Sequence, residues 1–393
     1  MRQPTQQSAA QNPAKDLLLL CMRPRLDGDA SKRILSIVGS ISDWDALLAA
    51  AAEHNLAPLV CKNVEACAGK ALPSTIAQRL SREFQGNSYR SLALTAELFR
   101  VLAALEDHGV NATPYKGPVL AAQAYGDIAL REFSDLDILL PQCQIVSAHR
   151  ALVALGFRSV ISGLQAPEIS RRIPGQYAYE RGTEAIVELH TEATLRYFPK
   201  VLDLDGICER REPVEVAGRQ VLTFSLEDTL LLLSVHGSKH LWERLGWIAD
   251  IAALSGARAV NWSRTLDRAR NWGVQRMALL GVGLAAHSQC APLPDEIAQC
   301  LKDDRVARRL ITGISQRFFA RGVQLGVFSR FAFRVHMRGS LAAGVPYALR
   351  LATMPTESDR GRHPRHLELL YALRRPLRLA RLYGWRSRAG PPF

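Results

Sequence analysis

The sequence lacks the features that would place it in a membrane or an oxidising compartment. No run reaches the roughly 18 apolar residues that a membrane span needs. The N-terminal stretch MRQPTQQSAAQNPAK is polar and has no apolar signal core, so residues 1–13 are predicted to form a disordered leader. The seven cysteines are odd in number and include no C-x-x-C pair, which favours reduced, packed thiols. These absences predict a cytoplasmic protein.

Lysine is missing from the last part of the chain, and acidic residues are scarce there. Residues 305–393 contain 18 Arg and three carboxylates, a net charge of +15, whereas residues 1–304 carry −2 of the total of +13. This imbalance argues against a nucleic-acid groove that extends across the whole protein. The apolar content of 48% and the length of 393 residues are typical of a globular protein with two or three domains.

The chain is organised around Thr113–Leu140, which ends in two carboxylates entering an apolar run, Asp135-Leu136-Asp137-Ile138-Leu139-Leu140. The apolar residues predict a buried strand. Because strand side chains alternate, Asp135 and Asp137 are expected on one face and Leu136 on the other. Two like charges on one face repel unless a cation lies between them, and carboxylate oxygens suit Mg²⁺ or Mn²⁺.

A Lys-Gly turn precedes a predicted helix upstream of this strand. Gly117 allows close approach of a ligand, Pro118 suits the first helical turn, and the free N–H groups there favour phosphate. A lone Asp-x-Asp is more often structural than catalytic. Its combination with Lys116-Gly117 and with Arg131 in the connecting loop favours a functional site.

These motifs resemble those of the nucleotidyltransferase fold typified by DNA polymerase beta. The stretch KGPVLAAQAYGDIALREFSDLDILL is similar to the bacterial family called uncharacterised nucleotidyltransferases, in which the turn is Lys-Gly and an Arg shortly precedes the Asp pair. The resemblance extends over the helical lead-in and fades after about residue 350. It implies an α+β fold, with a small mixed-sheet core flanked by N-terminal and C-terminal helical regions.

The resemblance also implies a third acidic group on a strand beside the Asp pair. We assign this role to Glu188, in the predicted strand Ala185–His190. Asp135, Asp137 and Glu188 are thus the catalytic and metal-binding candidates. His190 is either a neighbouring or substrate-contacting group or a solvated strand residue.

A later helix carries His236 and His240, which stand four residues apart and can face the same way. A zinc site lacks a third ligand and the Glu of His-Glu-x-x-His, so it is not favoured. The resemblance implies that this helix packs near the cleft, where His240, Lys239 or Arg244 meets the triphosphate or the acceptor. The nucleotide- and phosphate-binding candidates are Lys116, Gly117, Arg131, Ser134, His240 and Arg244.

The pattern predicts a disordered leader (1–13), an N-terminal helical region (14–90), the nucleotidyltransferase core (91–224), a C-terminal helical domain (225–355) and a basic tail (356–393). A capping box at Ser42–Asp45 opens one helix, and separate helices are expected over 74–84, 88–105, 266–271, 275–290 and 294–319. Strands are expected over 111–115, 135–140, 157–161, 176–181 and 185–190, followed by a hairpin over 212–224.

Together these features predict a metal-dependent nucleotidyltransferase that moves a nucleoside monophosphate from an NTP to a hydroxyl-bearing acceptor and releases pyrophosphate. The acceptor is a small molecule, a peptide or an RNA. The alternatives are a catalytically weak nucleotide-binding or toxin–antitoxin-type protein of the same fold, or an RNA-modifying enzyme that uses the basic tail. The Arg-rich tail segment 367–385 fits an anionic membrane, RNA, an acidic partner or a solvated helix end.

Overall fold

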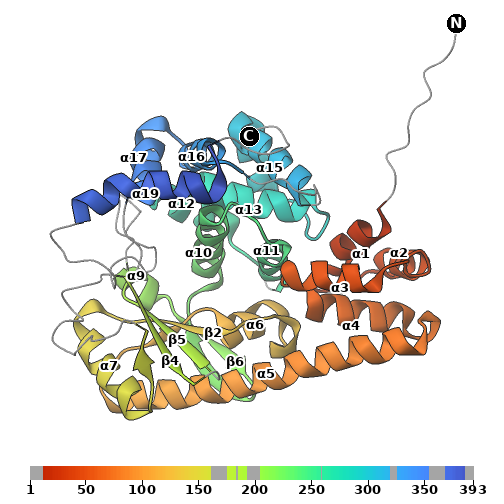
Figure 1. The fold of residues 1–393 in the computed structure, drawn as a ribbon, viewed down its shortest axis with the longest axis horizontal. Coiled ribbons are helices and arrows are strands. Elements are labelled where there is room, and N and C mark those ends of the chain that lie inside the picture. Colours follow the sequence, from red (N-terminus) through yellow and green to blue (C-terminus); the bar gives the residue numbers. More distant parts are fainter. Residues whose placement is uncertain are drawn as a thin grey trace, which may run out of the picture.

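The computed structural model describes residues 12–160, 175–182, 185–192, 204–257, 259–318, 325–353 and 368–385. Within them the fold is α+β, as predicted: a five-stranded mixed sheet and a two-stranded hairpin lie between N-terminal and C-terminal helices (Figure 1). Most of the predicted leader, residues 1–11, lies outside the described part, and the first helix begins at Pro13. No helix found there is both long enough and apolar enough to cross a bilayer.

The N-terminal helices begin at one side of the molecule, and the last and longest of them runs from there along the sheet to the opposite side (Figure 1). They are α1 (Pro13–Cys21), α2 (Gly28–Val38), α3 (Trp44–Glu53), α4 (Ala57–Ala68) with the 3₁₀ turn η1 (Gly69–Ala71), and α5 (Ser74–Asp107). The predicted capping box at Ser42 is wrong in its capping residue. Asp43 is the N-cap of α3, and its carboxylate accepts a hydrogen bond from the Ala46 amide at 2.8 Å.

The two helices predicted between residues 74 and 105 are one continuous helix, α5, of 34 residues. The expected break at Gln85-Gly86-Asn87 is absent because Asn87 has a tertiary role. Its buried side-chain amide donates hydrogen bonds to the carbonyls of Ala129 (2.8 Å) and Arg131 (3.4 Å). This fixes the loop that leads into the Asp-x-Asp strand.

The central sheet has the strand order β1-β2-β5-β4-β3, in which β2 and β5 are parallel and the other neighbours are antiparallel. The strands are β1 (Thr113–Pro114), β2 (Asp135–Leu139), β3 (Arg158–Ser159), β4 (Gln176–Arg181) and β5 (Ala185–His190). β4 and β5 have the predicted bounds, and the end of the third expected strand, Ile161, lies outside the described residues. Between them lie α6 (Gly117–Tyr125), α7 (Ile145–Ala154) and the 3₁₀ turns η2 (Ile128–Leu130) and η3 (Gln142–Gln144).

The two faces of the sheet differ in character. Leu136, Ile138, Val187 and Leu189 are buried in a hydrophobic cluster that includes residues of α5 and α7. The opposite face carries the carboxylates of β2 and β5 and lies below α10 (Leu226–Lys239; Figure 1). The sheet therefore presents one apolar face to its supporting helices and one polar face to the C-terminal helices.

A hairpin and further helices follow the sheet. They are α9 (Leu204–Glu209), β6 (Glu212–Val216), β7 (Arg219–Thr223), α10, α11 (Leu245–Ala257), α12 (Trp262–Asn271), α13 (Gln275–His287), α14 (Asp295–Asp303), α15 (Arg305–Arg317), α16 (Val327–His336), α17 (Leu341–Thr353) and α19 (Glu368–Tyr383). The single helix predicted over 294–319 is divided at Asp304. This residue ends α14 and caps α15, since its carboxylate accepts from the Ala307 amide at 2.9 Å.

Part of the basic tail forms α19, which packs on α16 and α17 (Figure 1). Pro376 lies inside this helix. Arg375 is buried, and the guanidinium of Arg330 lies 4.1 Å from the ring centroid of Tyr383. Some of the tail's charge is thus held within the fold, while binding to RNA, an anionic membrane or an acidic partner stays a prediction.

Candidate active site

The parallel pairing of β2 with β5 brings acidic side chains together. The register places Asp137 opposite Glu188 and Leu139 opposite His190. Because side chains alternate along each strand, Asp135, Asp137, Glu188 and His190 share one face. Asp135 lies two residue pairs from the Asp137–Glu188 pair in one direction, and His190 lies two pairs from it in the other.

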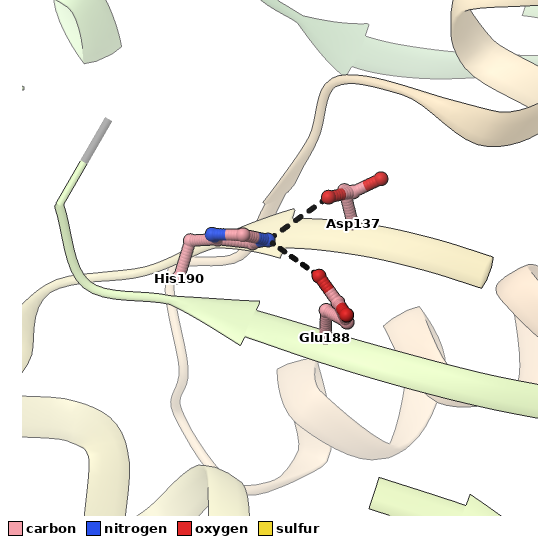
Figure 2. A group of neighbouring side chains, drawn as sticks. All are labelled: Asp137, Glu188 and His190. Atoms are coloured by element: carbon pink, nitrogen blue, oxygen red, sulfur yellow. Dashed lines mark hydrogen bonds and ion pairs between the residues drawn. The ribbon is translucent and has the colours of Figure 1, made fainter. Parts of the chain in front are cut away.

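Three of these side chains converge at the C-terminal end of the two strands (Figure 2). Nε2 of His190 lies 2.9 Å from Oδ1 of Asp137 and 3.6 Å from Oε2 of Glu188. The Gln176 amide donates to Oε2 of Glu188 at 2.5 Å. The potential ligand atoms of Asp137, Glu188 and His190 all lie within 4.8 Å of one another, and this is the one such group among the described residues.

The Lys-Gly turn lies directly against this cluster. Nζ of Lys116 is 3.0 Å from Oδ1 of Asp137. Gly117 has a positive φ of 56°, and a Cβ on it would lie 3.1 Å from the carbonyl oxygen of Asp135, so glycine suits this position on both counts. Among the described residues no side chain caps the N-terminus of α6, which leaves N–H groups of its first turn for a ligand.

The pKa values of Asp135 and Asp137 are shifted in opposite directions by their surroundings. Burial alone would raise the pKa of Asp137, but the Lys116 ammonium and the hydrogen bond with His190 lower that pKa well below its usual value. Burial, together with the charges of Asp137 and Glu188, raises the pKa of Asp135. Burial would lower the pKa of His190, yet its hydrogen bonds with Asp137 and Glu188 raise it overall. Asp135 is therefore the aspartate at which burial and like charges outweigh the nearby cations Lys116 and Arg131.

A cavity of about 290 Å³ lies above the polar face of the sheet. One side is formed by Lys116 and the sheet, and the other by α10, from Thr229 to its last turn. The charged and ionisable residues that line it include Lys116, Asp135, Glu188, His190, His236, Lys239 and His240. The cavity thus brings the predicted phosphate-binding turn, two of the predicted carboxylates and the predicted histidine helix together.

The wall formed by α10 carries one ionisable amine, Lys239, and two histidines. No hydrogen bond or ion pair joins the Lys239 side chain to the rest of the described chain. Burial, and next the nearby Lys116 ammonium, lower the pKa of Lys239 to about 8. The rings of His236 and His240 lie 4.7 Å apart between centroids, and burial lowers the pKa of His240 to about 3. This wall therefore offers an ammonium and two neutral imidazoles.

A strained turn fixes the end of α10. Leu241 and Trp242 both have positive φ, at 57° and 54°, a conformation that L-residues rarely adopt. The fully buried Trp242 ring fits against Gly237, where a Cβ would lie 2.5 Å from Cζ3 of the ring. The packed ring holds the turn, and the turn sets where Lys239 and His240 enter the cavity.

The remaining predicted site residues have other surroundings. Nε of Arg131 lies 3.1 Å from both carboxylate oxygens of Asp250, which also accepts from the Tyr125 hydroxyl at 2.9 Å. Ser134 is exposed just before β2. Arg244 donates to Oδ1 of Asn55 at 3.1 Å. None of Arg131, Ser134 and Arg244 lines the cavity as described, so their contact with nucleotide stays a prediction.

The sequence reasoning missed two features of the site. It left the role of His190 open, although the two-residue alternation that selected Glu188 also places His190 on the same face. It named Lys239 only as one of several residues near the cleft. The signal for Lys239 would have been its spacing of three residues from His236, since residues three apart share a helix face.

The donor set fits a divalent cation. Asp135, Asp137 and Glu188 offer the oxygen ligands that Mg²⁺ and Mn²⁺ take, and His190 adds an imidazole nitrogen. The Lys116 ammonium already lies beside Asp137, which indicates that these carboxylates attract positive charge. The arrangement thus matches a metal-assisted transfer site, in which carboxylates on neighbouring strands face a phosphate-binding turn.

A family model agrees with this class of site. The family model described as uncharacterised nucleotidyltransferase matches residues 40–288, well over half of the chain, and the chain belongs to this family. The protein is accordingly an enzyme of the nucleotidyltransferase class. No curated protein sequence matches the chain.

Two similar solved structures are both of ANT(2″)-Ia. The crystal structure in complex with adenylyl-2″-tobramycin is 13% identical, and the match covers 46% of this chain and 96% of that one with a TM-score of 0.33. The solution structure of this antibiotic-resistance factor is 14% identical, and the match covers 58% and 94% with a TM-score of 0.28.

Proposed function

We propose that the protein transfers a nucleoside monophosphate from an NTP to a hydroxyl-bearing acceptor, with release of pyrophosphate, and that it requires Mg²⁺ or Mn²⁺. The observation that carries this proposal is the pairing of Asp137 with Glu188 beside the Lys116-Gly117 turn, at one cavity. Family membership supports nucleotidyl transfer in general. The acceptor is a small molecule, a peptide or an RNA.

Asp135, Asp137 and Glu188 would hold the divalent cations. When bound, such cations offset the negative charge on the attacking and leaving oxygens. Burial and the charges of Asp137 and Glu188 raise the pKa of Asp135, so its carboxylate would be stabilised by a further positive charge.

The two walls of the cavity would hold the nucleotide phosphates. The Lys116 ammonium lies on one side, just before α6 begins, and the Lys239 ammonium lies on the other. A polyanion between them compensates both ammonium groups and the free end of the helix. The same groups stabilise pyrophosphate as it leaves.

Glu188 would act on the acceptor. It lines the cavity, and its side chain is 24% exposed, so a hydroxyl group can reach it. The acceptor hydroxyl gives its proton to the Glu188 carboxylate while its oxygen attacks the α-phosphorus. The bond between the α-phosphorus and the bridging oxygen breaks, and pyrophosphate departs.

Labelled nucleotides test the proposal. Each NTP, labelled at either the α- or the γ-phosphate, is incubated with the protein, Mg²⁺ or Mn²⁺ and a cell extract. Transfer of the α-label, but not of the γ-label, to an acceptor is expected. Asp135→Asn should abolish transfer, while Glu188→Gln should slow it by about 10²- to 10⁴-fold and keep NTP affinity.

Other outcomes would contradict the proposal. Transfer of the γ-label would indicate phosphoryl transfer. NTP binding without labelling of any acceptor, in all extracts and with both metals, would favour the non-catalytic binding or toxin–antitoxin-type alternative.

A further inference from the structure

We propose that His190 is a metal ligand, so that the site has two unlike ends: a carboxylate position at Asp135 and Asp137, and a mixed position at Asp137, Glu188 and His190. The mixed position is expected to take Mn²⁺ in preference to Mg²⁺. This inference rests on the proposed metal-dependent nucleotidyl transfer and deepens it by assigning a ligand and a metal preference.

The strand register separates the two ends. Asp135 lies opposite Ile186, Asp137 opposite Glu188, and Leu139 opposite His190. Asp137 is central, so its carboxylate is within reach of both ends. His190 is the end member on β5 and Asp135 is the end member on β2, which gives one end an imidazole and the other a second carboxylate.

The His190 ring is turned back toward the carboxylates (Figure 2). Its Nε2 lies 2.9 Å from one oxygen of Asp137 and 3.6 Å from one oxygen of Glu188. One nitrogen and two oxygens from three side chains thus point at a common small volume. Tyr115 packs edge-on to the imidazole, at 5.5 Å between ring centroids, and limits its rotation.

The volume between Asp137, Glu188 and His190 already has a cation, the Lys116 ammonium, beside it. Nζ of Lys116 lies 3.0 Å from the same oxygen of Asp137 that His190 contacts. The side chain of Asp137 is only 2% exposed and that of His190 is 8% exposed. Water cannot provide much of the charge compensation at such depth, so the protein or a bound cation must provide it.

The chemistry of the donors sets the metal preference. Mg²⁺ takes oxygen ligands almost exclusively, whereas imidazole nitrogen suits the first-row transition metals. Mn²⁺ accepts both carboxylate and imidazole ligands. A position made of two carboxylates and one imidazole therefore favours Mn²⁺ over Mg²⁺ more strongly than a position made of three carboxylates does.

The competing explanation is that His190 only positions Asp137 through their hydrogen bond. The variant His190→Gln separates the two roles because the glutamine amide can still donate to Asp137 but is a poor metal ligand. His149→Gln is a matched control. His149 lies on α7, beneath the apolar face of the sheet, with Nδ1 3.1 Å from the Tyr179 hydroxyl.

Pulsed electron paramagnetic resonance of Mn²⁺ bound to the full chain tests the ligand directly. Mn²⁺ is added alone or with inorganic triphosphate, which contains no nitrogen. The parent and His149→Gln should show coupling between Mn²⁺ and a nitrogen nucleus. His190→Gln should lose it, with Mn²⁺ affinity lower by about 10-fold or more and Mg²⁺ affinity changed by less than about 3-fold.

Two results would overturn the inference: no nitrogen coupling in the parent, or coupling that persists in His190→Gln. His190→Asn serves if the glutamine variant fails to fold. Mn²⁺ bound without nitrogen coupling removes His190 from the ligands and leaves the proposed function standing. Failure of both metals to support α-label transfer removes the proposed function itself.

Discussion

The ammonium of Lys116 lies 3.0 Å from Oδ1 of Asp137, so a residue expected to hold phosphate is paired with a residue expected to hold metal. The two roles compete in the ligand-free protein. A cation bound by Asp137 would displace the ammonium, which would then be available to a nucleotide. Metal and NTP are therefore expected to bind with positive coupling.

Lys116→Met tests this coupling. The variant keeps much of the apolar stem but removes the charge, and NTP binding should weaken by about 1.5 to 3 kcal/mol, the range for a hydrogen bond to a charged group. Mn²⁺ alone should bind more tightly, because the competing ammonium is gone. Calorimetry measures both, and binding of a nucleoside without phosphates should hardly change.

Lys62→Met is the control, since Lys62 is exposed on α4 and does not line the cavity. Equal NTP affinities for the parent and Lys116→Met would remove Lys116 from the nucleotide site. Unchanged Mn²⁺ affinity would show that the ion pair with Asp137 does not compete with metal.

Substitution of the two aspartates should affect stability in opposite ways. Asp137→Asn leaves the Lys116 ammonium without its carboxylate in a buried place and should lower the free energy of unfolding by about 3 kcal/mol. Asp135→Asn removes a charge that Asp137 and Glu188 repel and should leave that free energy unchanged or higher. Urea unfolding without divalent metal measures both, and equal losses would contradict the assigned charges.

NTP affinity should depend on the protonation of Lys239. The pKa of Lys239 is lowered to about 8 in the free protein, and a bound anion raises it. Below that pH the lysine is charged in both states. Above it the free lysine is neutral and must take up a proton on binding, so affinity should fall as pH rises, by up to about tenfold per pH unit. Calorimetry in buffers of different ionisation enthalpy should detect this uptake.

Lys239→Met should abolish the pH dependence and bind NTP less well at neutral pH. Folding stability provides a second measurement. Since the unfolded lysine binds a proton that the native lysine has lost, parent stability should rise relative to the variant between pH 8 and 10.5. A pH dependence that survives in the variant would assign it to another group.

A substitution at Gly237 tests whether the packing of the Trp242 ring stabilises the end of α10. Gly237→Ala places a methyl group against the buried Trp242 ring and should destabilise the protein by about 1 to 3 kcal/mol. Gly256→Ala is the matched control. This glycine lies in α11 with nothing within 4 Å of an added Cβ, and alanine there should stabilise by about 0.5 to 1 kcal/mol. Denaturant unfolding compares them, and an unchanged stability of Gly237→Ala would show that Trp242 adapts.

Local patterns were enough to predict the strands that carry the site. The bounds of β4 and β5 agree with the two-residue alternation, because each strand has one face in the core and one at the cavity. The Lys-Gly turn and the Asp pair were found in the same way, from residues whose conformational preferences are local.

Features that depend on distant partners were not predicted. Asn87 is typical of a helix break by its local preference, but its hydrogen bonds to the Ala129 and Arg131 carbonyls keep it inside α5. The pairing of Arg131 with Asp250 joins residues 119 positions apart, and no local pattern indicates it. That Lys239 has no hydrogen-bond or ion-pair partner within the described part of the chain is likewise evident only from the tertiary structure.

α5 links the two hydrophobic cores. Leu80 near its start belongs to the cluster formed with the N-terminal and C-terminal helices, while Leu94, Leu98 and Val101 belong to the cluster beneath the sheet. A chain cut at residue 90 would divide this helix and leave each core without part of its packing. The two cores should therefore melt in one cooperative transition, and the catalytic sheet should not be separable from its helical neighbours as an independently folding fragment.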